Sequence, residues 1–299
     1  MIAAARRTLA LSVLVLVALL TARPAAAALS SAKVLGQLPD DVTSMAAVDI
    51  AAARKGDGFA AISAEVLRVA PDLASILTSG KLDALDLTSL IAGELPGGEV
   101  VSLLEGRLPP DLLDRTKYSA MTTDRGVTVY TIGGMEAAML GKRLAMASVG
   151  QMRRLIDLHT GAKTTTSAKK GKRAAWLRKA AKATVTSRHG WAIARAQGSI
   201  NSALAGVGIK ASWISVSIKL GADTEIEARL ELPSAADATR AAADGAAAIA
   251  TFAPQAAMFG LGKTFAAVQF KASKAVLSVA VTVPRGEVNS LITMARPFL

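Results

Sequence analysis

The chain has 299 residues, with 35 Lys and Arg against 23 Asp and Glu, two His and no Cys. Without Cys there is no disulfide scaffold, thiol catalysis, cysteine-ligated zinc or iron–sulfur cluster, and no cysteine-anchored lipoprotein. With only two His, a multi-histidine metal site is excluded, and with 4% aromatic residues few side chains are available to stack on nucleic-acid bases. The length allows one large domain or two ordinary ones.

Residues 1–28 have the three parts of a secretory signal peptide. Two adjacent arginines open it, residues 8–20 form an apolar run, and an alanine run ends in Ala27 and Ala28. The apolar run is shorter than the roughly 20 residues that span a bilayer, so we expect cleavage after one of these two alanines. General secretion to the periplasm or the cell exterior follows, with a retained membrane anchor as the alternative.

The net charge of +12 is concentrated in two places. Three arginines leave with the signal peptide, and residues 163–188 hold nine basic residues and no acidic one. The rest of the mature chain carries 23 basic and 23 acidic residues, so it is neutral overall. A nucleic-acid partner is therefore not expected, because export and a neutral body both argue against one.

The basic segment 163–188 is the candidate contact with a partner. It opens as a lysine-rich loop and continues as an amphipathic helix, in which Trp176 and Leu177 lie on or beside the apolar face. In one interpretation, the helix packs Trp176 and Leu177 against the core and exposes its charged residues to water. In the other, the helix binds an anionic surface through Trp176 and its basic residues. The two interpretations are compatible if the helix packs on the core while the lysine-rich loop stays free. The residues expected to contact an anionic surface are Lys163, Lys169, Lys170, Lys172, Arg173, Trp176, Arg178, Lys179 and Lys182.

In the first half, residues 29–162, periodicity and turn residues predict alternating strands and helices. The expected elements are a strand at 45–50, an amphipathic helix at 59–76 that Pro71 kinks or restarts, a helix at 82–95, a strand at 99–104, a hairpin of 117–121 with 126–132, a strand at 143–148 and a helix at 149–160.

In the second half, residues 189–299, the pattern is a strand followed by two strand–strand–helix units. The expected elements are a strand at 191–196, a hairpin of 212–220 with 224–232, a helix capped by Ser234, a hairpin of 265–270 with 275–283 and a final helix through 288–295. Residues 245–262 carry no charge, but they are mostly Ala and Gly. A buried helix pair is therefore favoured over a membrane span, and no transmembrane helix is expected in the mature chain.

These elements predict an α+β protein with two similar halves, each an antiparallel sheet with helices packed on one face. Three stretches carry a resemblance: Leu38-Pro39-Asp40-Asp41 before a strand ending at Ile50, the strand Lys142–Ser148 running into a helix, and 227–242. In these the chain resembles uncharacterised secreted bacterial proteins, many from Gram-negative species, in which two related α+β halves follow a signal peptide. The resemblance is architectural. It implies a periplasmic or surface location, no known catalytic residues, and a structural role for the helix at 176–183.

Two short motifs match known sites only in part. Gly262-Lys263-Thr264 is similar to the end of a phosphate-binding P-loop, but Ala257 stands where that motif needs glycine, so a turn entering a hairpin is expected. Ser167-Ala168-Lys169-Lys170 matches S-x-x-K, but its companion motifs are absent and lysine-rich sequence produces the match by chance.

No catalytic, cofactor-binding or metal residue is predicted. Asp157 and His159 are two positions apart and so lie on different helix faces, and His159 is better placed to complement a helix dipole. Glu225, Glu227 and Glu231 alternate along one strand face, which is typical of a solvated face rather than a calcium loop.

The sequence thus favours a non-enzymatic, exported binding or scaffold protein of the cell envelope. Its partner would be a protein or an anionic envelope surface, contacted in part through 163–188. An exported enzyme or small-ligand-binding protein with a pocket between the two halves is the alternative.

Overall fold

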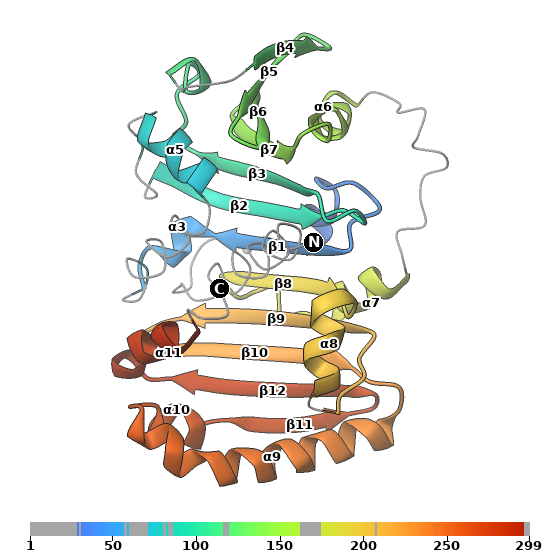
Figure 1. The fold of residues 1–299 in the computed structure, drawn as a ribbon, viewed down its shortest axis with the longest axis vertical. Helices are drawn as coiled ribbons and strands as arrows, with labels where there is room; N and C mark the ends of the chain where they lie inside the picture. The colour runs from blue at the N-terminus through green and yellow to red at the C-terminus, as the bar shows by residue number, and fades with distance from the viewer. Residues whose placement is uncertain are drawn as a thin grey trace.

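The computed structural model describes residues 29, 31–56, 59, 71–79, 82, 86–115, 120–161, 175–206 and 208–295. Over these residues the protein is built on one antiparallel sheet of twelve strands (Figure 1), in the order β11-β12-β10-β9-β8-β1-β2-β3-β7-β6-β5-β4. The α+β class and the antiparallel sheet expected from the sequence are confirmed. One continuous sheet, however, takes the place of a sheet for each half.

The strands are β1 (Ser44–Asp49), β2 (Leu87–Glu94), β3 (Val100–Gly106), β4 (Ala120–Asp124), β5 (Val127–Ile132), β6 (Met135–Leu140), β7 (Arg143–Ser148), β8 (Gly190–Arg195), β9 (Trp213–Leu220), β10 (Thr224–Glu231), β11 (Gln269–Ser273) and β12 (Val276–Val283). The helices are α2 (Ser31–Leu35), α3 (Ile50–Ala53), α5 (Pro71–Ser79), η2 (Leu113–Arg115), α6 (Met152–Thr160), α7 (Ala175–Ala183), α8 (Gly198–Gly206), α9 (Ala235–Met258), α10 (Gly262–Ala266), η3 (Arg285–Glu287) and α11 (Val288–Ala295).

The two halves of the chain join through the pairing of β1 with β8. The register sets Met45 opposite Ile193, Ala46 opposite Ala192 and Ala47 opposite Trp191. Strands β1, β2, β3, β7, β6, β5 and β4 lie on one side of this join, and β8, β9, β10, β12 and β11 lie on the other. The first and second halves of the sequence therefore form adjacent parts of one sheet.

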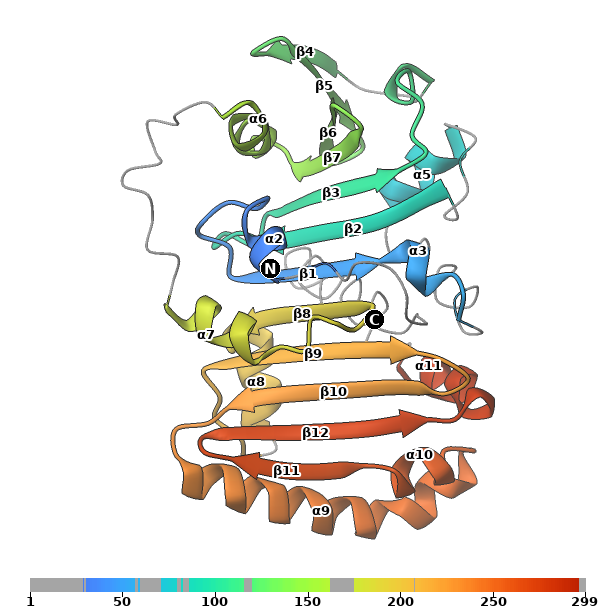
Figure 2. The same cartoon turned by 180° about the vertical axis from the view of Figure 1, so that it is seen from behind.

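Successive residues of each strand point to opposite sides of the sheet. Leu103 belongs to a core with α2, α6 and α7, whereas Leu104 belongs to a core with α5 and η2. We call the first side the α7 face and the second the α8 face; Figure 1 is viewed from the α8 face and Figure 2 from the α7 face. The first half carries helices on both faces, so the expectation of helices on one face was wrong there, since both faces of β2 and β3 are apolar.

The sequence placed some elements correctly and others not. The hairpin of β9 and β10 is confirmed, with Val216 opposite Ala228. The helix predicted at 82–95 was wrong, because residues 87–94 form β2, a central strand buried on both faces. Strand β6 was not predicted. Most of the helix predicted at 59–76 lies outside the described residues, and α5 is its described end.

The uncharged segment 245–262 forms the end of α9 and the start of α10. It is not a buried pair, because Phe252, Met258 and Phe259 expose 53%, 85% and 67% of their surface. Gly245 allows α9 to lie against β11, since an added Cβ would lie 2.4 Å from Phe270 Cε1. Among the helices that the structure describes, none is long and apolar enough to cross a membrane.

Candidate functional site

Helix α7, the described helix of the basic segment, is docked on the sheet. Leu177, Ala180 and Ala181 are buried in the core of the α7 face, and Trp176 packs against that core while half-buried. Figure 2 shows α7 lying across β8 and β9. The docking interpretation of this helix is therefore right for its apolar side, and Trp176 is a packing residue rather than an exposed anchor.

Two cations of the segment pair with carboxylates of β10 on the same face. Lys179 forms an ion pair and hydrogen bond with Glu231. Arg188 lies 3.2 Å from Glu227 and 3.9 Å from Glu225. The acidic residues of β10 thus hold the basic segment against the sheet.

The β10 carboxylates have further partners within their own hairpin. Lys219 Nζ lies 2.7 Å from Glu225, and Arg229 Nε lies 2.7 Å from Glu227. Partial burial raises the pKa of Glu231, but hydrogen bonds from Lys179 and Ser212 outweigh it, so the net pKa is lowered. Every glutamate of this row is therefore ion-paired. The expected solvated face is wrong for Glu227 and Glu231, whose side chains are only 13% exposed.

Arg178 and Lys182 remain as the outward charges of α7. They are one helical turn apart and exposed, and no ion pair joins either to another described residue. The other predicted contact residues, Lys163, Lys169, Lys170, Lys172 and Arg173, lie outside the described residues. Among the described residues of the predicted site, Trp176 and Lys179 contact the sheet or its core, whereas Arg178 and Lys182 face outward.

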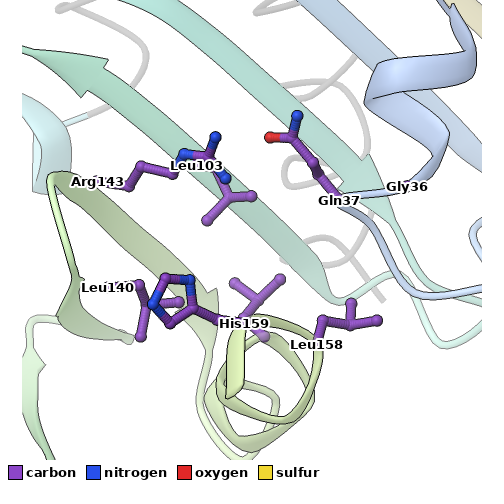
Figure 3. A pocket seen from close by; sticks show the side chains of 8 residues that line it. Gly36, Gln37, Leu103, Leu140, Arg143, Leu158 and His159 are labelled. Carbon is purple, nitrogen blue, oxygen red and sulfur yellow. The ribbon is translucent and has the colours of Figure 1, made fainter. Parts of the chain in front are cut away.

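A pocket with a volume of about 190 Å³ lies on the α7 face of the first half, beneath α6 (Figure 3). Its polar lining residues come from three elements: Gln37 follows α2, Arg143 begins β7, and His159 lies in the last turn of α6. The remaining lining residues are Gly36, Leu103, Leu140, Leu155 and Leu158. None of these residues was predicted as a site.

Arg143 is held by a polar row across three neighbouring strands. Ser89, Glu105 and Arg143 are register partners on β2, β3 and β7. The Arg143 Nε donates to Glu105 Oε1 at 2.6 Å, and the Ser89 hydroxyl donates to Glu105 Oε2 at 3.2 Å. This fixes the guanidinium at the pocket and balances its charge with that of Glu105.

Gln37 and His159 complete the polar lining. The Gln37 Oε1 atom is buried and accepts no hydrogen bond from the described residues. His159 lies beside the turn between β6 and β7, where Gly141 adopts φ +64° and an added Cβ would lie 3.7 Å from the ring. The pocket thus presents a fixed guanidinium, an unsatisfied acceptor and an imidazole above a floor of leucines.

Asp157 does not face the pocket, although it is two residues from His159. Its buried carboxylate lies 2.8 Å from Arg125, in the turn between β4 and β5. The expectation that Asp157 and His159 lie on different faces is confirmed, and His159 does occupy the last turn of α6. The two residues form no acid–base pair.

The P-loop-like motif begins the short helix α10, so the predicted hairpin-entry turn was wrong. The backbone N–H groups of Lys263 and Thr264 donate to the Glu287 carboxylate at 3.1 and 2.8 Å. A carboxylate from the chain itself therefore occupies the place a phosphate would take. The S-x-x-K match at 167–170 lies outside the described residues, among which no group of three or more His, Asp or Glu could hold a metal ion.

Comparisons with known proteins bear on the fold. No family model matches the chain, and no curated protein matches it. The structure is similar to crystal form III of TP0453, with a TM-score of 0.51 and 10% identity over 87% of this chain and 97% of that one. Crystal form I of TP0453 gives 0.48 at the same identity, over 87% of this chain and 96% of that one. This likeness shows the fold alone.

Proposed function

We propose that this chain is an exported, non-enzymatic binding or scaffold protein of the bacterial cell envelope, which contacts an anionic envelope surface through residues 163–188. The observation that carries the proposal is the division of charge on α7. Its apolar side and Lys179 contact the sheet, while Arg178 and Lys182 face outward on a helix that follows the lysine-rich residues 163–173 in the sequence. An outward row of cations beside a neutral body is suited to an anionic surface.

Export is part of the same proposal. The chain would be cleaved near Ala28, and the buried Leu29 then begins the folded body, where its carbonyl accepts a hydrogen bond from Trp191 Nε1 at 2.8 Å. The resemblance to secreted bacterial proteins supports the same location.

We also propose that the two halves are related units. The strand order β1-β2-β3-β7-β6 of the first half parallels β8-β9-β10-β12-β11 of the second. Along the chain, α6 follows β7 as α11 follows β12, although α6 packs on the α7 face and α11 on the α8 face. The hairpin of β4 and β5 occupies the place in the chain taken by α9 and α10. The basic segment then connects two equivalent units.

The alternative is an exported enzyme or ligand-binding protein with a pocket between the halves, and the described pocket does not bear on it directly. The pocket beneath α6 is lined by first-half residues alone.

The proposal is tested by sedimentation of the mature chain with vesicles of anionic phospholipid and with vesicles of neutral phosphatidylcholine. Each basic residue near an anionic surface contributes about 1 kcal/mol. Deletion of 163–172, which removes four lysines, is therefore expected to weaken binding by up to roughly a thousand-fold, and R178Q/K182Q by about thirty-fold. Binding is also expected to weaken as salt rises.

The matched control is Lys210→Gln with Lys271→Gln, which removes the same charge from two exposed positions away from α7. This control is expected to bind as the parent does. Equal retention of the parent, the deletion and R178Q/K182Q would refute the proposed surface contact.

A further inference from the structure

We propose that the pocket beneath α6 binds the acetamido group of an N-acetylated compound. The site is separate from the basic segment, so the inference does not depend on binding to an anionic surface. It follows from four features of the pocket: its size, its floor, its charge balance and the one acceptor that its surroundings leave unsatisfied.

The size and floor suit a small group with an apolar end. The volume of about 190 Å³ compares with a cavity of about 150 Å³ that holds benzene, so it accommodates about six non-hydrogen atoms. Leu103, Leu140 and Leu155 form the floor and are almost fully buried, since they belong to the core of the α7 face. An acetyl methyl group placed there would lose its contact with water.

The charge balance favours a neutral ligand. The Arg143 guanidinium and the Glu105 carboxylate share a hydrogen bond of 2.6 Å, so the pair carries no net charge. The terminal N–H groups of Arg143 make no hydrogen bond to another described residue and remain available as donors. They would donate to a neutral carbonyl oxygen, whereas a carboxylate would also meet the charge of Glu105.

The unsatisfied acceptor requires a ligand donor. Gln37 Oε1 is buried without a hydrogen-bond partner among the described residues, and such an atom is costly unless something donates to it. Figure 3 shows Gln37 and Arg143 on one side of the pocket and His159 on the other. A secondary acetamide supplies the missing N–H next to the carbonyl that Arg143 would bind. An amino sugar or an N-acetylated amino acid could each present this group, and the open mouth leaves room for the rest of either molecule.

The test is a titration of the leucine-methyl-labelled mature chain, followed by NMR. The methyl groups of Leu103, Leu140, Leu155 and Leu158 report directly on the pocket. N-acetylglucosamine and the methyl ester of N-acetylalanine are expected to shift them saturably, with dissociation constants of about 1–10 mM for so small an anchoring group. Glucosamine, glucose and acetate are expected to bind at least about ten-fold more weakly, since each lacks part of the group. The tighter of the two acetamides identifies the source of the ligand.

Two variants assign the contacts. Gln37→Met keeps the shape of the side chain but removes the acceptor, and it is expected to weaken both acetamides about ten-fold. Arg143→Lys keeps the partner of Glu105 but removes the planar fork, with an expected loss of about three- to ten-fold. Gln269→Met, at an exposed position on β11, is the matched control and is expected to change nothing. The proposal is overturned if neither acetamide shifts these methyl groups at about 50 mM, if acetate or glucose binds as well, or if Gln37→Met binds as the parent does.

Discussion

The guanidinium of Arg125 lies 2.8 Å from the buried carboxylate of Asp157, which fastens the tip of the hairpin of β4 and β5 to α6. Arg125 reaches it from a turn in which its own φ is +51°, a conformation uncommon for a residue with a side chain. A second, longer pair joins Arg153 to Asp124 at 3.8 Å. Because α6 also lines the pocket, this hairpin supports the helix from the side opposite His159.

Replacing Arg125 tests that support. Arg125→Gln leaves the Asp157 carboxylate buried without its cation, and we expect a loss of about 1–3 kcal/mol in the free energy of unfolding, measured by urea denaturation. Arg153→Gln removes an exposed, longer pair and should cost less than about 0.5 kcal/mol. Equal losses in the two variants would contradict a special role for the Arg125–Asp157 pair.

The docking of α7 makes a separate prediction. Leu177 is 1% exposed, so Leu177→Ala should lower the free energy of unfolding by about 2–5 kcal/mol and increase amide hydrogen exchange along α7. Arg178→Ala, at the next position but on the outward side, should stay within about 0.5 kcal/mol of the parent. A small effect of Leu177→Ala would mean that α7 is detached in solution.

The free energy of unfolding should depend on pH through Glu94. Burial raises the pKa of Glu94 above its ordinary value of 4.5, and a hydrogen bond from Ser44 offsets the effect only in part. A group with a raised pKa in the folded state contributes stability that is complete below the ordinary pKa and lost as pH rises through the raised value. Glu94→Gln should therefore gain stability relative to the parent as pH rises above 4.5. If Glu94 were hydrated, its pKa would be ordinary, and denaturation curves across that range would show no change in the difference between Glu94→Gln and the parent.

Glu231 should behave in the opposite sense. Its pKa is lowered, so the pair with Lys179 stabilises the fold above the ordinary value of 4.5 and loses that effect as pH falls through the lowered value. Lys179→Gln should raise the pKa of Glu231, followed by NMR titration of its carboxyl carbon, and cost under about 1 kcal/mol at neutral pH. The cost should disappear in acid. Lys182→Gln is the control, and an unchanged Glu231 pKa in Lys179→Gln would show that the pair does not form.

Strands in which polar and apolar residues alternate could be predicted from the sequence, and strands that are apolar on both faces could not. The alternation of Ile214, Val216 and Ile218 with Ser215 and Ser217 placed β9 correctly, although Ser215 and Ser217 are buried on the α7 face as Trp213 is. Strand β2 shows no such alternation, and an apolar run of that kind is equally typical of a buried helix. Strand β6 consists of Met, Glu, Ala and Leu, residues that favour helices, and its place between β5 and β7 overrides that preference.

Prediction of the candidate sites from the sequence was limited in a similar way, because only features that are contiguous in the sequence could be recognised. The basic segment was visible because its charge is contiguous in the sequence, but its pairing of Arg188 with Glu227 joins residues 39 positions apart. The pocket was invisible, because Gln37, Arg143 and His159 become neighbours only when α2, β7 and α6 pack on one face. The sequence signal for the pocket was Arg143, a charged residue at the start of an otherwise apolar strand. Arginines are common at strand ends, so this signal alone does not indicate a binding site.

The pairing of β1 with β8 has a consequence for how the chain folds and for how it can fail. Until residues 190–195 are available, β1 is an open edge whose residues Met45–Val48 carry no charge and no proline to block pairing with another chain. Each half therefore shields the aggregation-prone edge of the other. A fragment that ends before β8 should self-associate, and two full chains could exchange halves by pairing β1 of one with β8 of the other, giving a domain-swapped dimer with the same hydrogen bonds.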